Sequence, residues 1–94
     1  MPKQTLKGRK RVTFALNADV DQSVFVAGSF NDWDSQKKPL KDKDGSGHYA
    51  ATVLLAPGSY EYKFVIDGDW CMDPSAVDWI ANELGSLNSV VRVG

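Results

Sequence analysis

Apolar and polar residues alternate along several short segments of the chain, most clearly over residues 60–66. Every second residue of this segment is aromatic or aliphatic, and the residues between them include Glu61 and Lys63. A period of two is typical of a β-strand with one buried and one solvent-facing side. We therefore expect Lys63 to face solvent. The Asp67-Gly68 pair that follows favours a tight turn, which would bring Trp70 close to Lys63.

Further segments have the composition of β-strands, and stretches rich in Gly, Pro and Asp separate them. Short strands about ten residues apart, divided by turns, favour an all-β fold and in particular an antiparallel β-sandwich. Residues 38–41 form a short strand at most, and Pro39 suits the edge of a sheet. The other expected strands are residues 11–17, 23–28, 48–55 and 88–93.

Residues 73–85 fit this strand pattern less well. Asp73 followed by Pro74 has the residue types of a helix start, and Gly85 has that of a helix end. The apolar residues between them recur at helical spacing. Local pattern alone therefore predicts a short helix in this segment.

The length of 94 residues allows one domain with one core. We expect residues 1–10 to be a disordered basic N-terminal arm and residues 11–94 to be the folded domain. No signal peptide is visible, and no apolar run is long enough to span a bilayer, so we expect a cytoplasmic or other intracellular protein without membrane association. The single cysteine, Cys71, fits a reducing compartment.

Charge is unevenly distributed along the chain. Five of the eleven Lys and Arg residues lie within the first eleven positions, whereas all twelve Asp and Glu residues come later. A basic arm on an acidic body suits contact with an anionic surface, so an anion-binding role is one hypothesis. The arm lacks the interleaved aromatic residues typical of single-strand nucleic-acid binding. A solvated terminus without a nucleic-acid partner is the favoured interpretation.

Four sequence blocks occur in a characteristic order: VFVAGSFNDW at 24–33, YEYKFVIDGDW at 60–70, Asp73-Pro74, and LGSLNSVV at 84–91. Together they resemble the glycogen-binding domain of AMP-activated protein kinase β subunits. More broadly they are similar to the family 48 carbohydrate-binding modules found beside isoamylases and glycogen branching enzymes. The resemblance covers residues 12–93. It implies an immunoglobulin-like sandwich of the early-set type that binds α-1,4-linked glucans.

The resemblance also implies a sugar-binding site. Two tryptophans would form stacking platforms, a lysine on the strand between them would contact the sugar, and the loop before the last strand would supply three more residues. It further implies that residues 73–85 are mostly irregular, with at most a short helical turn, and we favour this over the helix. The implied carbohydrate-binding residues are Trp33, Lys63, Trp70, Leu84, Ser86 and Asn88, together with Asn31 in the turn before Trp33.

The chemistry of these residue types suits a sugar. An exposed indole can cover the apolar C–H face of a pyranose ring at a low cost in side-chain entropy. Each stacked face contributes about 1–2 kcal/mol to the free energy of binding, because it removes apolar area from water. Lys63 offers three donors, and Asn88 both donates and accepts, so these side chains can bind ring hydroxyl groups.

A second hypothesis is a protein-interaction or regulatory module that packs against a glycogen- or starch-metabolising enzyme or a kinase complex, because family relatives also pack against catalytic domains. Trp79 matches no typical platform residue. It either extends the platform or covers the edge of the core.

Catalysis, metal binding and cofactors are not expected. No nucleophile with a base is apparent, and the acidic residues lie in turns of a domain too small for a catalytic cleft. Residues 42–47 imitate the start of a calcium loop, but Val53 occupies the position of the required acidic ligand. His48 is the only histidine. Asp69 and Asp73 should raise the thiol pKa of Cys71 and keep it unreactive.

Overall fold

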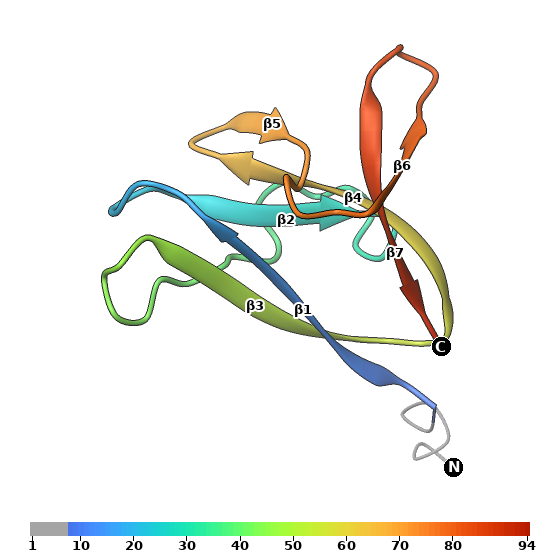
Figure 1. The fold of residues 1–94 in the computed structure, drawn as a ribbon, viewed down its shortest axis with the longest axis horizontal. Coiled ribbons are helices and arrows are strands. Elements are labelled where there is room, and N and C mark those ends of the chain that lie inside the picture. Colours follow the sequence, from blue (N-terminus) through green and yellow to red (C-terminus); the bar gives the residue numbers. More distant parts are fainter. Residues whose placement is uncertain (1–7) are drawn as a thin grey trace.

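The computed structural model describes residues 8–94, and in that part of the chain it contains β-strands and no helix (Figure 1). It follows that these residues form no helix long and apolar enough to cross a membrane. The expected disordered arm at 1–10 lies largely outside the described residues, and the first strand already includes Lys10. The strands are β1 (Lys10–Asn17), β2 (Val24–Gly28), β3 (His48–Leu55), β4 (Gly58–Ile66), β5 (Asp69–Cys71), β6 (Asp78–Ala81) and β7 (Leu87–Val93).

The strands form two antiparallel sheets that pack as the layers of a sandwich, which confirms the expected fold class. β1 and β3 pair along their full length in a two-stranded sheet. The second sheet has five strands in the order β2-β4-β7-β6, and β5 also pairs with β4. Figure 1 shows the β1–β3 pair beside β2 and β4. The buried core residues come mainly from these four strands, so the core lies between the two pairs.

Alternate residues of the strands supply the core, as the hydrophobic pattern predicts. Val26 of β2 and Phe64 of β4 are completely buried. The ring of Phe14 stacks on Phe30 with centroids 5.3 Å apart and meets the edge of Tyr62 at 4.8 Å. Aromatic pairs in these geometries add stabilisation beyond the area they bury.

β4 is the central strand of the larger sheet and changes partner halfway along one edge. β2 pairs with the other edge of β4, from Val24 opposite Ile66 to Gly28 opposite Tyr62. On the changing edge, β7 pairs with β4 up to Tyr62, and β5 pairs with it from Phe64 onward. Lys63 therefore lies at the point where β4 passes from β7 to β5.

Residues 38–41 cross from one sheet to the other. Pro39 forms a bridge with Phe25 of β2, and Lys41 forms one with Ala50 of β3. The expected short edge strand is thus present as two isolated bridges, one on each sheet.

The helix that the local pattern favours for residues 73–85 is wrong. The N–H of Ala76 donates to the carbonyl of Asp73 in a single turn. The chain then forms β6, which pairs with β7. An irregular start with a short turn agrees with the family expectation, whereas β6 was not expected. Pairing with β7 satisfies the backbone of this segment and overrides its helical spacing.

Candidate functional site

A cavity of about 300 Å³ opens where β4 changes partner. Six of the seven residues proposed from the sequence lie around it, and Asn82 joins them. The remaining residue, Asn31, does not line this cavity. The lining residues are Trp33, Lys63, Trp70, Asn82, Leu84, Ser86 and Asn88.

The β4–β5 hairpin places Trp70 beside Lys63. Asp67 and Gly68 form its two-residue loop, and both have positive φ, 49° and 87°. Two central residues with positive φ are typical of a tight hairpin turn, so the predicted turn is confirmed. Trp70 lies opposite Val65 in the register and remains 47% exposed. Val65 is buried although it belongs to the outward-facing set, because it lies between Phe25 and Trp70 on the neighbouring strands.

The turn after β2 holds Trp33, which is half-buried. The carbonyl of Gly28 accepts from the N–H groups of Asn31 and Trp33 at 3.1 and 2.9 Å. The Asn31 side chain accepts from Gly28 N–H at 2.9 Å and donates to the Val26 carbonyl at 3.1 Å. Asn31 therefore fastens the turn that carries Trp33.

This turn has an unusual backbone. Asp32 and Trp33 both have φ of 58°, a region that residues with a side chain adopt at a cost of about 1–2 kcal/mol each. A Cβ on Gly28 would lie 2.5 Å from the carbonyl oxygen of Glu61 and 2.6 Å from the Phe30 ring, so only glycine fits there. The close packing of Gly28 and the bonds of Asn31 together hold Trp33 in this conformation.

Asn82 organises the loop between β6 and β7. Its Oδ1 accepts from the N–H groups of Leu84 and Ser86 at 2.9 and 3.1 Å. Its Nδ2 donates to the Ser86 hydroxyl at 2.7 Å and to Asn88 Oδ1 at 3.3 Å. Sequence reasoning missed this residue because the segment was compared with a helix. An Asn three residues before Gly85 is nevertheless a turn signal.

A chain of hydrogen bonds connects the polar side chains that line the cavity. Lys63 Nζ donates to the Ser86 hydroxyl at 3.0 Å, and Asn88 Nδ2 donates to Glu61 Oε1 at 2.9 Å. Lys63 keeps two further N–H donors, and the Ser86 hydroxyl keeps its proton to donate. Asn88 is only 6% exposed, so its amide is largely committed to the network. Leu84, in contrast, is 91% exposed.

Hydrogen bonds hold the residues that follow Trp70 in the sequence to the larger sheet. The Tyr62 hydroxyl donates to Asp73 Oδ2 at 2.6 Å, and Asp73 N–H donates to the Ser89 hydroxyl at 2.9 Å. Burial raises the pKa of Tyr62, and the Asp73 carboxylate raises it further. Burial also raises the pKa of the Cys71 thiol, with smaller contributions from Asp69 and Asp73. The predicted direction for Cys71 is confirmed, although burial is the largest cause.

Trp79 lies on β6 opposite Ser89 and is 58% exposed. It does not line the cavity that contains the other two tryptophans. Its exposure also argues against the interpretation that it covers the edge of the core.

Residues 11–94 match the family model described as the glycogen recognition site of AMP-activated protein kinase. Over 72 residues, 77% of this chain, the sequence is 38% identical to 5'-AMP-activated protein kinase subunit beta-2 of Mus musculus and of Homo sapiens, covering 25% of each. It is 35% identical over 72 residues to subunit beta-1 of Sus scrofa, covering 55% of that sequence. The chain thus spans between a quarter and about half of the length of these relatives. The expected resemblance is confirmed: the chain belongs to the family of glycogen recognition sites of AMP-activated protein kinase.

Proposed function

We propose that this chain is a non-catalytic module that binds α-1,4-linked glucans, as in glycogen, starch or maltooligosaccharides, in the cavity between Trp33 and Trp70. One observation carries the proposal: two partly exposed indoles, one from β5 and one from the turn after β2, lie around a single cavity that also contains hydrogen-bond donors. The family match supports glycogen as the ligand.

The two tryptophans act as stacking platforms. Each indole that covers a pyranose face removes apolar surface from water, which contributes about 1–2 kcal/mol. Trp70 sits on a short hairpin and Trp33 on a turn fastened by Asn31, so little conformational entropy is lost on binding. Leu84 adds an apolar contact from the opposite loop. The cost of association leaves a weak-to-moderate affinity.

The polar side chains bind the sugar hydroxyl groups. Lys63 and Ser86 offer donors that their own hydrogen bond leaves free. Asn88 contributes the amide N–H and the oxygen lone pair that its bonds to Glu61 and Asn82 leave available. Asn31 and Asn82 are positioning residues, the first for Trp33 and the second for Leu84 and Ser86.

A titration with maltoheptaose, followed by tryptophan fluorescence, tests the proposal. We expect saturable binding in the unmodified chain and at least about a tenfold loss in Trp70→Ala, equivalent to 1.4 kcal/mol. Trp79→Ala is the matched control, because this exposed tryptophan lies outside the cavity and its removal should leave the affinity unchanged. No binding at millimolar maltoheptaose, or equal losses in both variants, would contradict the proposal.

The relatives are named as subunits of a kinase, so we also propose that the module works within a larger assembly, such as a kinase complex or a glucan-metabolising enzyme. Binding of sugar and attachment to a partner are compatible roles. A properly folded chain that ignores maltoheptaose would instead favour the interaction role alone.

A further inference from the structure

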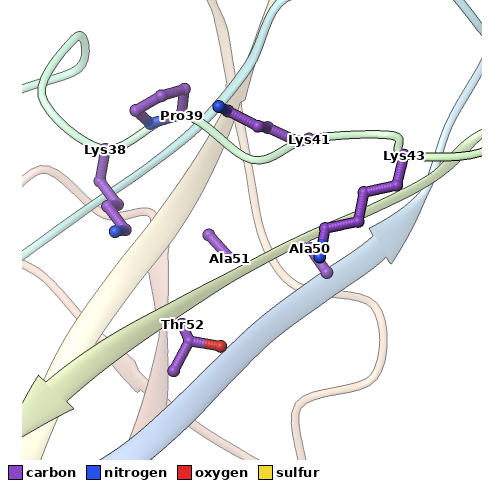
Figure 2. Close-up of a pocket in the computed structure, with 7 residues that line it drawn as sticks. All are labelled: Lys38, Pro39, Lys41, Lys43, Ala50, Ala51 and Thr52. Carbon is purple, nitrogen blue, oxygen red and sulfur yellow. The ribbon is translucent and has the colours of Figure 1, made fainter.

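A second hollow, of about 250 Å³, shares no lining residue with the sugar cavity. It lies between residues 38–43, which include the crossing segment at 38–41, and the open edge of β3 (Figure 2). Its character is basic, since three of its residues are lysines. The lining residues are Lys38, Pro39, Lys41, Lys43, Ala50, Ala51 and Thr52.

Positive charge is concentrated here against the trend of the domain. Only six of the eleven Lys and Arg residues follow position 11, and four of those six lie between positions 37 and 43. Three of these four line the hollow, and the fourth, Lys37, does not. Lys37 is therefore a natural internal control for any effect of the others.

The neighbouring acidic residues, Asp42 and Asp44, accept hydrogen bonds within their own loop. Asp42 accepts from the N–H groups of Ser46 and Gly47 at 3.0 and 2.7 Å. Asp44 accepts from the Ser46 hydroxyl at 2.6 Å, and hydrogen bonds from Ser46 are the main reason why the pKa of Asp44 is lowered. Neither carboxylate lines the hollow. Within residues 8–94, no carboxylate forms an ion pair with Lys38, Lys41 or Lys43.

The hollow also contains a backbone donor. Ala50 exchanges both of its backbone hydrogen bonds with Lys41 at 3.0 Å. In an antiparallel strand, N–H groups two residues apart point to the same edge, so the N–H of Thr52 points to the open edge of β3. Figure 2 shows Lys38 and Lys43 extending from the crossing segment toward this strand.

We propose that this hollow binds a phosphate group, either as free phosphate or as the phosphomonoester of a sugar. A phosphate group has several strong acceptor oxygens, and lysines bind it as point charges without strict geometry. The N–H of Thr52 at the open edge of β3 adds a neutral donor. The Thr52 hydroxyl is 3.4 Å from the hydroxyl of Thr13, and it can donate to phosphate when it accepts from Thr13. Because the lysines are partly or fully exposed, the affinity is modest and weakens with salt. The proposal does not rest on the glucan site.

Amide NMR spectra of the full chain, titrated with inorganic phosphate and separately with glucose 6-phosphate at constant ionic strength, test this proposal. We expect saturable shifts at Lys41, Ala51 and Thr52. Each of Lys38→Gln and Lys43→Gln should weaken binding by about threefold, and the double variant by about tenfold. Lys37→Gln should leave binding unchanged, and every variant should keep its maltoheptaose affinity.

The comparison of the two probes identifies the source of the phosphate. Glucose 6-phosphate binding at least as tightly as inorganic phosphate supports a sugar phosphomonoester, and tighter binding of inorganic phosphate supports the free ion. The proposal is overturned if chloride at the same ionic strength produces the same shifts, or if Lys37→Gln weakens binding as much as Lys43→Gln. It is also overturned if the shifts do not saturate. Unchanged amide signals of the core show that each variant is folded.

Discussion

β4 and the β6–β7 hairpin contain similar apolar residues but expose them very differently. On β4, Phe64 is completely buried and Tyr62 is 4% exposed. On and beside the hairpin, Trp79 is 58% exposed, Val77 88% and Leu84 91%. Hydrophobicity alone therefore does not decide burial in this domain.

The difference arises from the opposite layer of the sandwich. β1 and β3 cover the inner side of β2 and β4, whereas the tip of the β6–β7 hairpin extends away from them (Figure 1). Apolar side chains on the hairpin thus remain in water, where they are available to a ligand. The buried region stabilises the fold, and under the proposed function the exposed hairpin supplies part of the binding surface. Substitutions in the two regions should therefore affect stability and binding to different extents.

The largest effect is expected in the buried region. Phe64→Ala removes a completely buried ring and should lower the free energy of unfolding by about 3–5 kcal/mol. Denaturation with urea measures this change. A loss below about 1 kcal/mol would mean that the layers pack less tightly than the structure indicates.

A smaller effect is expected in the hairpin loop. Asn82→Ala removes the acceptor for Leu84 and Ser86 and should lower stability by about 1–2 kcal/mol. The maltoheptaose affinity should fall about tenfold, because the loop is no longer held in its binding geometry. Fluorescence titration measures the affinity, and Glu83→Ala, at an exposed neighbouring position, is the control. Full affinity in Asn82→Ala would show that this loop does not need Asn82 for binding.

The hydrogen bond from Tyr62 of β4 to Asp73, which precedes the β6–β7 hairpin, should make a modest contribution to stability that depends on pH. Tyr62→Phe removes the hydrogen bond to Asp73 and should cost about 1 kcal/mol of stability at neutral pH. The pKa of Tyr62 is raised on folding, so its contribution is fully present below about pH 10, the ordinary tyrosine pKa, and is lost as pH rises above it. Unfolding measured from pH 7 to 11 should show the two proteins converging. A constant difference would contradict this assignment.

The smallest effect on stability is expected at the exposed tip. Leu84→Ala should change the free energy of unfolding by less than about 0.5 kcal/mol. It should weaken maltoheptaose binding about threefold, because only part of one apolar contact is lost. Val77→Ala, equally exposed but outside the cavity, should change neither property. Equal affinity in the two variants would place Leu84 outside the site.

Much of the site could be anticipated from local pattern and family resemblance. The alternation of residues 60–66 correctly predicted which side of β4 faces the core. The Asp67-Gly68 pair indicated the turn that precedes Trp70. Six residues chosen from the sequence lie around one cavity. Asn31 was also chosen, but its amide is used in the turn that holds Trp33. Hydrogen bonds within a turn of this kind are not visible in residue type alone.

The sequence by itself determined the alternation of the strands, the positions of the turns and the residue types of the site, because these depend on neighbours within a few positions. Only the tertiary structure decided that Asp78–Ala81 is a strand and that Asn82 organises the next loop. Only it decided that Val65 is buried and that Lys63 lies where β4 changes partner. These features depend on which strand lies alongside, and such pairings join residues that are distant in the chain.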